Sequence, residues 1–150
     1  MEIIKISKEN EEQLLELGFK TPKDSKTFEG CIFDIFGAKY FQENDYLVII
    51  TKDVYAKVTA MELSSFRESF KASNPDYIIL AIKSIQQGIL DTNGMIRDGQ
   101  AFSIGLQTVS PLIDRLISGS DADCFYDDTK VELAEKQIAK LYDVIMKGEW

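Results

Sequence analysis

The fold class is decided by residues 46–58, which read YLVIITKDVYAKV. Residues 46–51 are almost all apolar, as is typical of a central strand that is buried on both faces. After a two-residue connection, residues 54–58 predict a strand that returns beside the first. Residues 30–42 upstream are also rich in β-branched and aromatic types, and Gly37 suits a bulge within one long strand. Together these residues predict a three-stranded antiparallel meander.

The second half of the chain carries the start signals and the spacing of helices. Asn74-Pro75 and Ser110-Pro111 each place a capping side chain before a proline at the first helical position. Thr59 and Thr129 each begin a T-x-x-E capping box. Two apolar helical stripes follow, Ile78, Ile82, Ile85 and Ile89 in one and Val131, Ala134, Ile138, Leu141 and Ile145 in the other. The sequence therefore predicts an α+β fold, in which a small antiparallel sheet packs against helices from the C-terminal half, and a single domain over residues 1–150.

Three shorter stretches complete the secondary-structure prediction. Residues 1–6 alternate between apolar and polar types and predict a short strand. The alternation of Phe102, Ile104 and Leu106 predicts a half-buried strand as well. The Asp-Gly pair within residues 97–100 predicts a hairpin turn. An alternative for this loop is a contact with a ligand or partner, with Arg97 as its anchor.

Histidine is absent from the 150 residues of the chain. Its absence removes the commonest general base and the commonest metal ligand, and it excludes Ser-His-Asp and Cys-His catalysis within this chain. An all-cysteine zinc site needs four thiolates, whereas Cys31 and Cys124 are the only cysteines. Each cysteine lies among apolar neighbours, which predicts a reduced, buried thiol. We therefore predict no catalytic residue, no metal ligand and no cofactor, and the sequence favours a role other than catalysis.

The formal net charge of the chain is −8. An excess of acid argues against binding to nucleic-acid phosphates, which attract a basic face, and is compatible with a basic protein partner. The apolar runs are far shorter than the ~20 residues of a membrane-spanning helix, so we predict no membrane association. No signal-peptide pattern is visible, so we predict a cytoplasmic location. The oligomeric state stays open at this point.

Carboxylates gather between positions 121 and 135, with one basic residue, Lys130, among them. They are Asp121, Asp123, Asp127, Asp128, Glu132 and Glu135. One interpretation is structural, because carboxylates before and within the first turn of a helix are favoured by the helix dipole and by its unpaired amides. A calcium-binding loop is a second interpretation, but Phe125 and Tyr126 occupy the positions where an EF-hand needs a ligand and a glycine.

A third interpretation rests on the stretch Ser120-Asp121-Ala122-Asp123-Cys124-Phe125. If residues 121–125 formed a strand, both aspartates would point to one face, as Mg²⁺-bound phosphate chemistry requires. The stretch resembles the metal-binding strand of DNA-polymerase-β-like nucleotidyltransferases. That resemblance implies a Mg²⁺-dependent nucleotidyltransferase that uses Asp121 and Asp123. The family also has an upstream Gly-Ser pair, whereas Gly105 of this chain is followed by Leu106.

The function favoured by the residues themselves is an acidic protein-binding module. In its more concrete form it is an inhibitor or immunity-type protein that neutralises a basic toxin or nuclease, such as a bacterial toxin. Acidic patches speed the encounter with basic partners of this kind. The side chains expected to contact the partner are Asp121, Asp123, Asp127, Asp128 and Arg97. The nucleotidyltransferase stays as the alternative.

Overall fold

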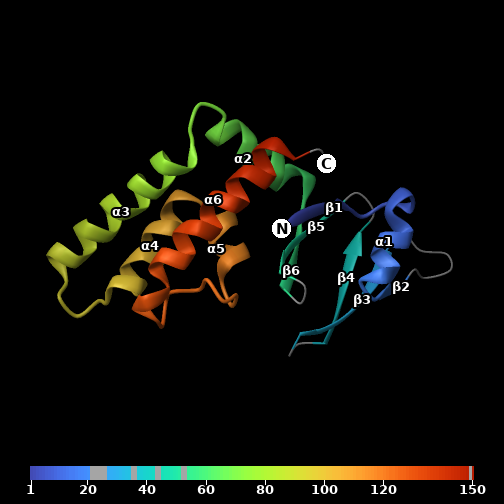
Figure 1. Ribbon diagram of the computed structural model, residues 1–150, viewed down its shortest axis with the longest axis horizontal. Helices are drawn as coiled ribbons and strands as arrows, with labels where there is room; N and C mark the ends of the chain where they lie inside the picture. The colour runs from blue at the N-terminus through green and yellow to red at the C-terminus, as the bar shows by residue number, and fades with distance from the viewer. Residues whose placement is uncertain (21–26, 35–36, 43–44, 52–53, 149) are drawn as a thin grey trace. The chain divides into compact units, whose positions relative to one another are not determined.

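The computed structural model describes residues 1–20, 27–34, 37–42, 45–51, 54–148 and 150. Their elements fall into two compact units, which are described separately below. The strand unit comprises Glu2–Ser64 and Glu149–Trp150, and the helical unit comprises Ser65–Gly148 together with Met1. Figure 1 shows that the helices belong mostly to the C-terminal half of the chain, so the predicted α+β class is confirmed. The prediction of a single domain stays a prediction.

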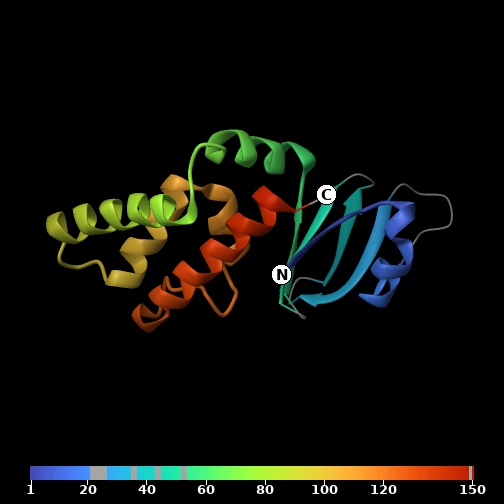
Figure 2. The same cartoon turned by 45° about the horizontal axis from the view of Figure 1, so that its top comes forward.

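One sheet of the strand unit contains β1 (Glu2–Lys5), β5 (Tyr46–Thr51) and β6 (Val54–Val58), in the order β1-β5-β6. Both pairings are antiparallel. The strands predicted over residues 1–6, 46–51 and 54–58 are therefore confirmed. A 3-10 turn (Lys8–Asn10) and α1 (Glu11–Glu16) follow β1, and Figure 2 shows α1 beside the strands. This part of the unit is held by a core of Ile4, Ile6, Leu14 and Leu47, against which Leu17 and Ile49 pack.

The second sheet contains β2 (Phe19–Lys20), β3 (Thr27–Asp34) and β4 (Gly37–Gln42), in the order β2-β3-β4. The prediction of one bulged strand through Gly37 was wrong, because β3 and β4 pair antiparallel with Asp34 opposite Gly37. Two strands that fold back on one another form backbone hydrogen bonds with each other. Their residue pattern is the same as that of one long strand, so the sequence does not distinguish the two arrangements. The third strand beside β5 and β6 is consequently β1, and not the upstream neighbour that a simple meander requires.

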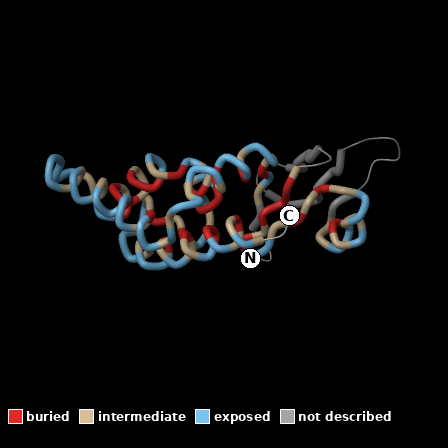
Figure 3. Tube along the Cα trace, turned by 90° about the horizontal axis from the view of Figure 1, so that it is seen from above, coloured by how far each residue is buried: buried red, intermediate tan, exposed pale blue. Residues whose placement is uncertain are grey.

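The helical unit is built from α2 (Ala60–Phe70, whose first turns belong to the other unit), α3 (Pro75–Thr92), α4 (Asp98–Val109), α5 (Pro111–Ile117) and α6 (Val131–Lys147). The predicted caps of α3 and α5 are confirmed: the Tyr77 amide donates to Asn74 Oδ1 at 3.1 Å and the Ile113 amide to Ser110 Oγ at 3.3 Å. Buried positions recur along the helices, as Figure 3 shows. No helix in the described part of the chain is both long and apolar enough to cross a membrane.

Helix α4 occupies residues for which the sequence predicted a strand and a hairpin turn. Phe102, Ile104 and Leu106 were predicted to form a strand, but they lie in the middle of α4, and Arg97 precedes the helix instead of opening a hairpin. Phe102 and Leu106 are both buried. Residues four apart lie on one face of a helix, and they also lie on one face of a strand, so this spacing fits both elements. Gly105 faces α3 at close range, because a Cβ built on it would lie 2.7 Å from the Ile82 carbonyl oxygen.

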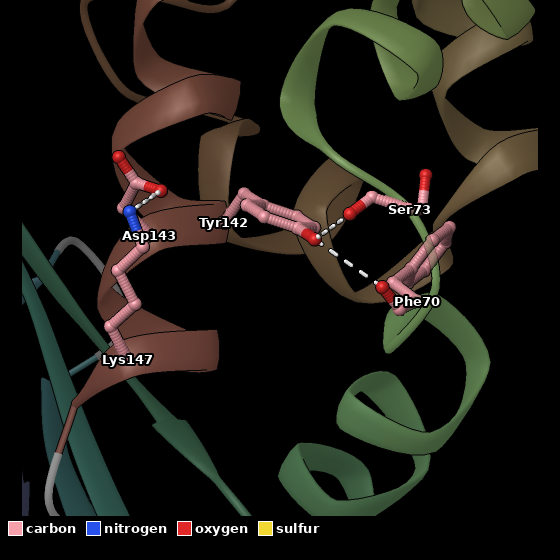
Figure 4. Close-up of polar contacts among 5 residues, drawn as sticks. All are labelled: Phe70, Ser73, Tyr142, Asp143 and Lys147. Carbon is pink, nitrogen blue, oxygen red and sulfur yellow. Dashed lines mark hydrogen bonds and ion pairs between the residues drawn. The ribbon is translucent and has the colours of Figure 1, made fainter.

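The ends of α2 and α6 exchange side-chain hydrogen bonds. Tyr142 on α6 donates its hydroxyl to the carbonyl oxygens of Ser73 at 2.7 Å and Phe70 at 3.3 Å, beyond the last turn of α2 (Figure 4). Arg67 on α2 donates from Nε to the Ile145 carbonyl oxygen at 2.8 Å and from Nη2 to that of Gly148 at 2.5 Å. Carbonyl groups at the end of a helix lack a partner within the helix. These bonds therefore satisfy the carbonyl groups of Ile145, Gly148 and Ser73, while that of Phe70 also accepts a bond from the Ser73 amide at 3.0 Å.

Candidate functional site

The acidic segment, residues 120–128, folds as a series of turns. Residues 121–125 do not form the strand that the nucleotidyltransferase interpretation requires. Asp123 explains the difference: its Oδ2 accepts a hydrogen bond from the Gly119 amide at 2.8 Å and its Oδ1 accepts one from the Phe125 amide at 3.1 Å. A short carboxylate that bonds nearby amides stabilises turns in competition with a strand. Asp121 is exposed.

Asp127 closes the last turn of the acidic segment. Its Oδ1 accepts hydrogen bonds from the Thr129 amide at 3.0 Å and from the Thr129 hydroxyl at 2.6 Å. These bonds, the side-chain one first, lower the pKa of the Asp127 carboxyl below its ordinary value. The capping box predicted from Thr129 to Glu132 was wrong, because the Thr129 hydroxyl is used by Asp127 and α6 begins after a short 3-10 turn (Asp128–Lys130).

Asp128 and Arg97 join the acidic segment to the start of α4. Asp128 Oδ1 accepts a hydrogen bond from the Gly99 amide at 2.9 Å, in the first turn of the helix, where the helix dipole favours a negative charge. Arg97 donates to the carbonyl oxygens of Phe125 at 2.9 Å and Tyr126 at 3.2 Å. Gly99 is required at this junction, because a Cβ at its position would overlap the Cys124 carbonyl oxygen.

Four of the five side chains predicted to contact a partner therefore belong to one network. Arg97, Asp123, Asp127 and Asp128 each bond backbone groups at or beside the acidic segment. Their first effect is to fix the shape of this segment and its junction with α4. Asp121 lies in the same segment. Whether any of these side chains contacts a partner stays a prediction.

A pocket of about 260 Å³ lies beside this network. Its walls come from α4, from α5 with the residue after it, and from the acidic segment; they are Ser103, Ile104, Gln107, Asp114, Ser118, Asp123, Phe125 and Tyr126. Burial, and then the charge of Asp123, raise the pKa of the Asp114 carboxyl above its ordinary value. The pocket therefore brings two carboxylates of like charge close enough to affect one another.

The aromatic wall of the pocket is formed by Phe125 and Tyr126. Their rings meet edge to face, with centroids 4.7 Å apart and an interplanar angle of 69°. Tyr126 is 80% exposed, which is high for an aromatic residue. Exposed aromatic side chains that are held in place are typical of binding hot spots.

No sequence pattern marks Asp114 as a site residue, although it lies in the pocket. An acid in the first turn of a helix is expected on electrostatic grounds alone, so its position in residues 111–117 carried no distinct signal. The tertiary contact between α5 and the acidic segment distinguishes it, and no local pattern predicts such a contact. No local pattern marks Tyr126 as a binding residue either.

Cys124, within the acidic segment, is a free, buried thiol, as predicted. Its Sγ lies 3.6 Å from Ser103 Oγ and donates to the Gly99 carbonyl oxygen at 3.5 Å. Burial raises the pKa of this thiol above its ordinary value, so little reactive thiolate forms. The side chain of Cys31 lies outside the described residues.

The geometry weakens the nucleotidyltransferase alternative. That mechanism needs Asp121 and Asp123 side by side on one face of a strand, whereas residues 121–125 form turns and both oxygens of Asp123 accept backbone hydrogen bonds. Within the described residues, no three or more Asp, Glu, Cys or His side chains are grouped so that they could hold a metal ion.

A larger pocket, of about 350 Å³, lies along β1 in the strand unit. Three of its polar side chains already bond one another or the backbone: Gln13 Nε2 donates to Glu2 Oε1 at 2.7 Å, and Asn10 Nδ2 donates to the Lys5 carbonyl oxygen at 2.9 Å. We regard the smaller pocket as the better candidate site, because it combines two adjacent carboxylates with an exposed aromatic side chain.

Comparisons with known protein families, with curated proteins and with solved structures each gave no match. The candidate site is therefore interpreted from its own chemistry.

Proposed function

We propose that this protein is an acidic protein-binding module and that its acidic segment meets a basic partner. The observation that carries the proposal is the way this segment is built. Arg97 and Asp128 tie it to α4, while Asp121 and Tyr126 are exposed upon it. A surface that is ordered before binding loses little conformational entropy when the partner arrives.

Charge supports a basic partner. The chain has a net charge of −8, and residues 120–128 contain four aspartates and no basic residue. A negative patch speeds diffusional encounter with a positive surface and disfavours acidic competitors. Tyr126 supplies the apolar contact that charges alone lack, because a tyrosine ring buries a large area in an interface.

The most concrete form of the proposal is an inhibitor or immunity-type protein in the cytoplasm that neutralises a basic toxin or nuclease. The chain lacks histidine, the commonest general base. The hydrogen bonds of Asp123, Asp127 and Asp128 go to backbone amides and so fix the shape of a surface. Tight inhibitors commonly present a preformed surface of this kind.

The test is a capture experiment with a matched pair of charge reversals. The full-length protein is immobilised, extract from its native source is passed over it in low salt, and bound proteins are identified and then eluted with increasing salt. Asp121→Lys reverses an exposed charge on the acidic segment, and Glu68→Lys makes the same change on an exposed position of α2. We expect one stoichiometric basic protein, released by salt and bound about tenfold more weakly by Asp121→Lys.

Binding that is indifferent to salt, or that Glu68→Lys and Asp121→Lys weaken equally, would contradict the proposal. Both variants alter the net charge by the same amount, so only a contact at the acidic segment separates them. Circular dichroism of both variants establishes that the fold is unchanged.

A further inference from the structure

We propose that the pocket between α4, α5 and the acidic segment receives a single arginine side chain of the basic partner. This inference rests on the proposed function and specifies which group of the partner is recognised. The pocket volume of about 260 Å³ lies just below the range of small-molecule sites, which begins at roughly 300 Å³. That size suits one side chain better than a separate cofactor or substrate.

Two carboxylates supply the attraction for a cation. Asp123 uses each oxygen once, for the Gly119 and Phe125 amides, and a carboxylate has lone pairs for further donors. Among the described residues, no hydrogen bond or ion pair is made by the Asp114 carboxylate. A guanidinium between Asp114 and Asp123 would remove their mutual repulsion, which contributes to the raised pKa of Asp114.

The other walls of the pocket favour arginine over lysine. Ser103, Ser118 and Gln107 present side-chain oxygens that can accept hydrogen bonds, and a guanidinium has five donors against three for an ammonium. The rings of Phe125 and Tyr126 offer aromatic surface on which a planar guanidinium stacks. Arg97 is not available for this role, because it bonds the backbone of the same two aromatic residues.

The test uses purified full-length protein, labelled with ¹⁵N, and three single-residue probes. They are N-acetylarginine amide, the lysine equivalent, and the citrulline equivalent, which keeps the shape of arginine without its charge. We expect amide shifts that saturate with a Kd of about 1 mM for the arginine probe, confined to residues lining the pocket, with weaker binding of the lysine probe and none of the citrulline probe.

Asp114→Asn is the decisive variant. It removes the charge and keeps the shape, and we expect it to weaken the arginine probe at least tenfold while leaving the melting temperature equal to or above that of the unmodified protein. Glu68→Gln is the matched control, because it removes a charge from an exposed position of α2 that does not line the pocket; it should bind the probe as before. Equal binding of arginine and citrulline probes, or an unchanged Kd in Asp114→Asn, would overturn the proposal.

Free agmatine distinguishes a partner's side chain from a small cationic ligand. Micromolar affinity for agmatine would overturn the assignment to a protein side chain.

The outcome for this pocket is also separable from that for the proposed function. If the partner is captured and Asp121→Lys weakens it, but the arginine probe does not bind, this inference fails and the protein-binding role stands. If the probe binds as expected and no partner is captured, the pocket assignment to a guanidinium stands and the proposed function fails.

Discussion

Arg67 and Tyr142 each bond the carbonyl end of the helix that carries the other. Arg67 of α2 reaches the Ile145 and Gly148 carbonyl oxygens at the end of α6, and Tyr142 of α6 reaches those of Phe70 and Ser73 at the end of α2. Figure 4 shows the tyrosine half of this exchange, with the exposed Asp143–Lys147 ion pair on the outer side of α6. Two helices that cap one another in this way are fixed in register.

We predict that Tyr142→Phe lowers the free energy of unfolding by about 1–2 kcal/mol, because it keeps the ring but leaves the Ser73 carbonyl oxygen without its donor, while the Phe70 carbonyl keeps only the Ser73 amide. Tyr142 is buried, so water replaces its hydroxyl poorly. The measurement is urea unfolding followed by far-ultraviolet circular dichroism. Tyr126→Phe serves as the control and should change stability by less than about 0.5 kcal/mol, because that side chain is exposed. Equal effects of the two substitutions would refute the capping role.

A second prediction contrasts two glycines that both lie in helices. Gly99→Ala should destabilise the protein by about 1–3 kcal/mol, because the added Cβ overlaps the Cys124 carbonyl oxygen and forces the acidic segment away from α4. Gly88→Ala should stabilise it by about 0.5–1 kcal/mol, because the position on α3 is open and alanine has the higher helix propensity. Thermal unfolding checks this pair: Gly99→Ala should lower the melting temperature and Gly88→Ala should raise it. A melting temperature that Gly99→Ala leaves unchanged or raises would contradict the close contact at Gly99.

Removing the charge of Asp114 should stabilise the free protein slightly. Burial and Asp123 raise the pKa of this carboxyl in the folded state, so the ionised form is disfavoured relative to the unfolded chain. Asp114→Asn should therefore be more stable at about pH 7, by about 0.5 kcal/mol or less, since solvent screens a partly exposed group. The difference should close as pH falls through the folded-state pKa toward the ordinary value of 3.8 and the wild-type carboxyl becomes neutral. Melting temperatures measured across this range check the sign, and a destabilised Asp114→Asn at neutral pH would contradict it.

Asp127 should show the opposite pH dependence. Its folded-state pKa lies below the ordinary value of 3.8, so its contribution to stability is present above that value and is lost as pH falls through the folded-state pKa. Asp127→Asn should melt below the unmodified protein at neutral pH, and the gap should narrow in acid. Melting curves at successive pH values measure the gap. If Asp121→Asn produces a loss of the same size, the effect belongs to the net charge of the segment and not to the bonds with Thr129.

Local signals predicted much of the secondary structure. The caps at Asn74 and Ser110 are formed by neighbouring residues, so the sequence contains all the information that they need. Helix α4 was mistaken for a strand because Phe102 and Leu106 fit both periods, and the contact of Gly105 with Ile82 that favours the helix is remote in sequence. The pairing of β1 with β5 spans a long stretch of chain, and no local pattern specifies it.

The sequence indicates only some of the residues that the candidate site contains. The run of aspartates indicated Asp123, Asp127 and Asp128, the Asp-Gly loop indicated Arg97, and the structure bonds Arg97 to the segment that holds the aspartates. Their hydrogen bonds go to backbone groups, which composition does not indicate. Asp114 reaches the same place from another helix, and only folding brings it there.

The burial of Cys124 has a kinetic consequence. Its thiol lies between the acidic segment and α4, bonded toward Gly99 and Ser103, so a reagent reaches it only when these two parts separate. In a Cys31→Ser background, the rate of alkylation of Cys124 thus reports how often the segment opens. A bound partner that rests on the segment should slow this reaction in proportion to its occupancy, which turns a core residue into a native sensor of binding.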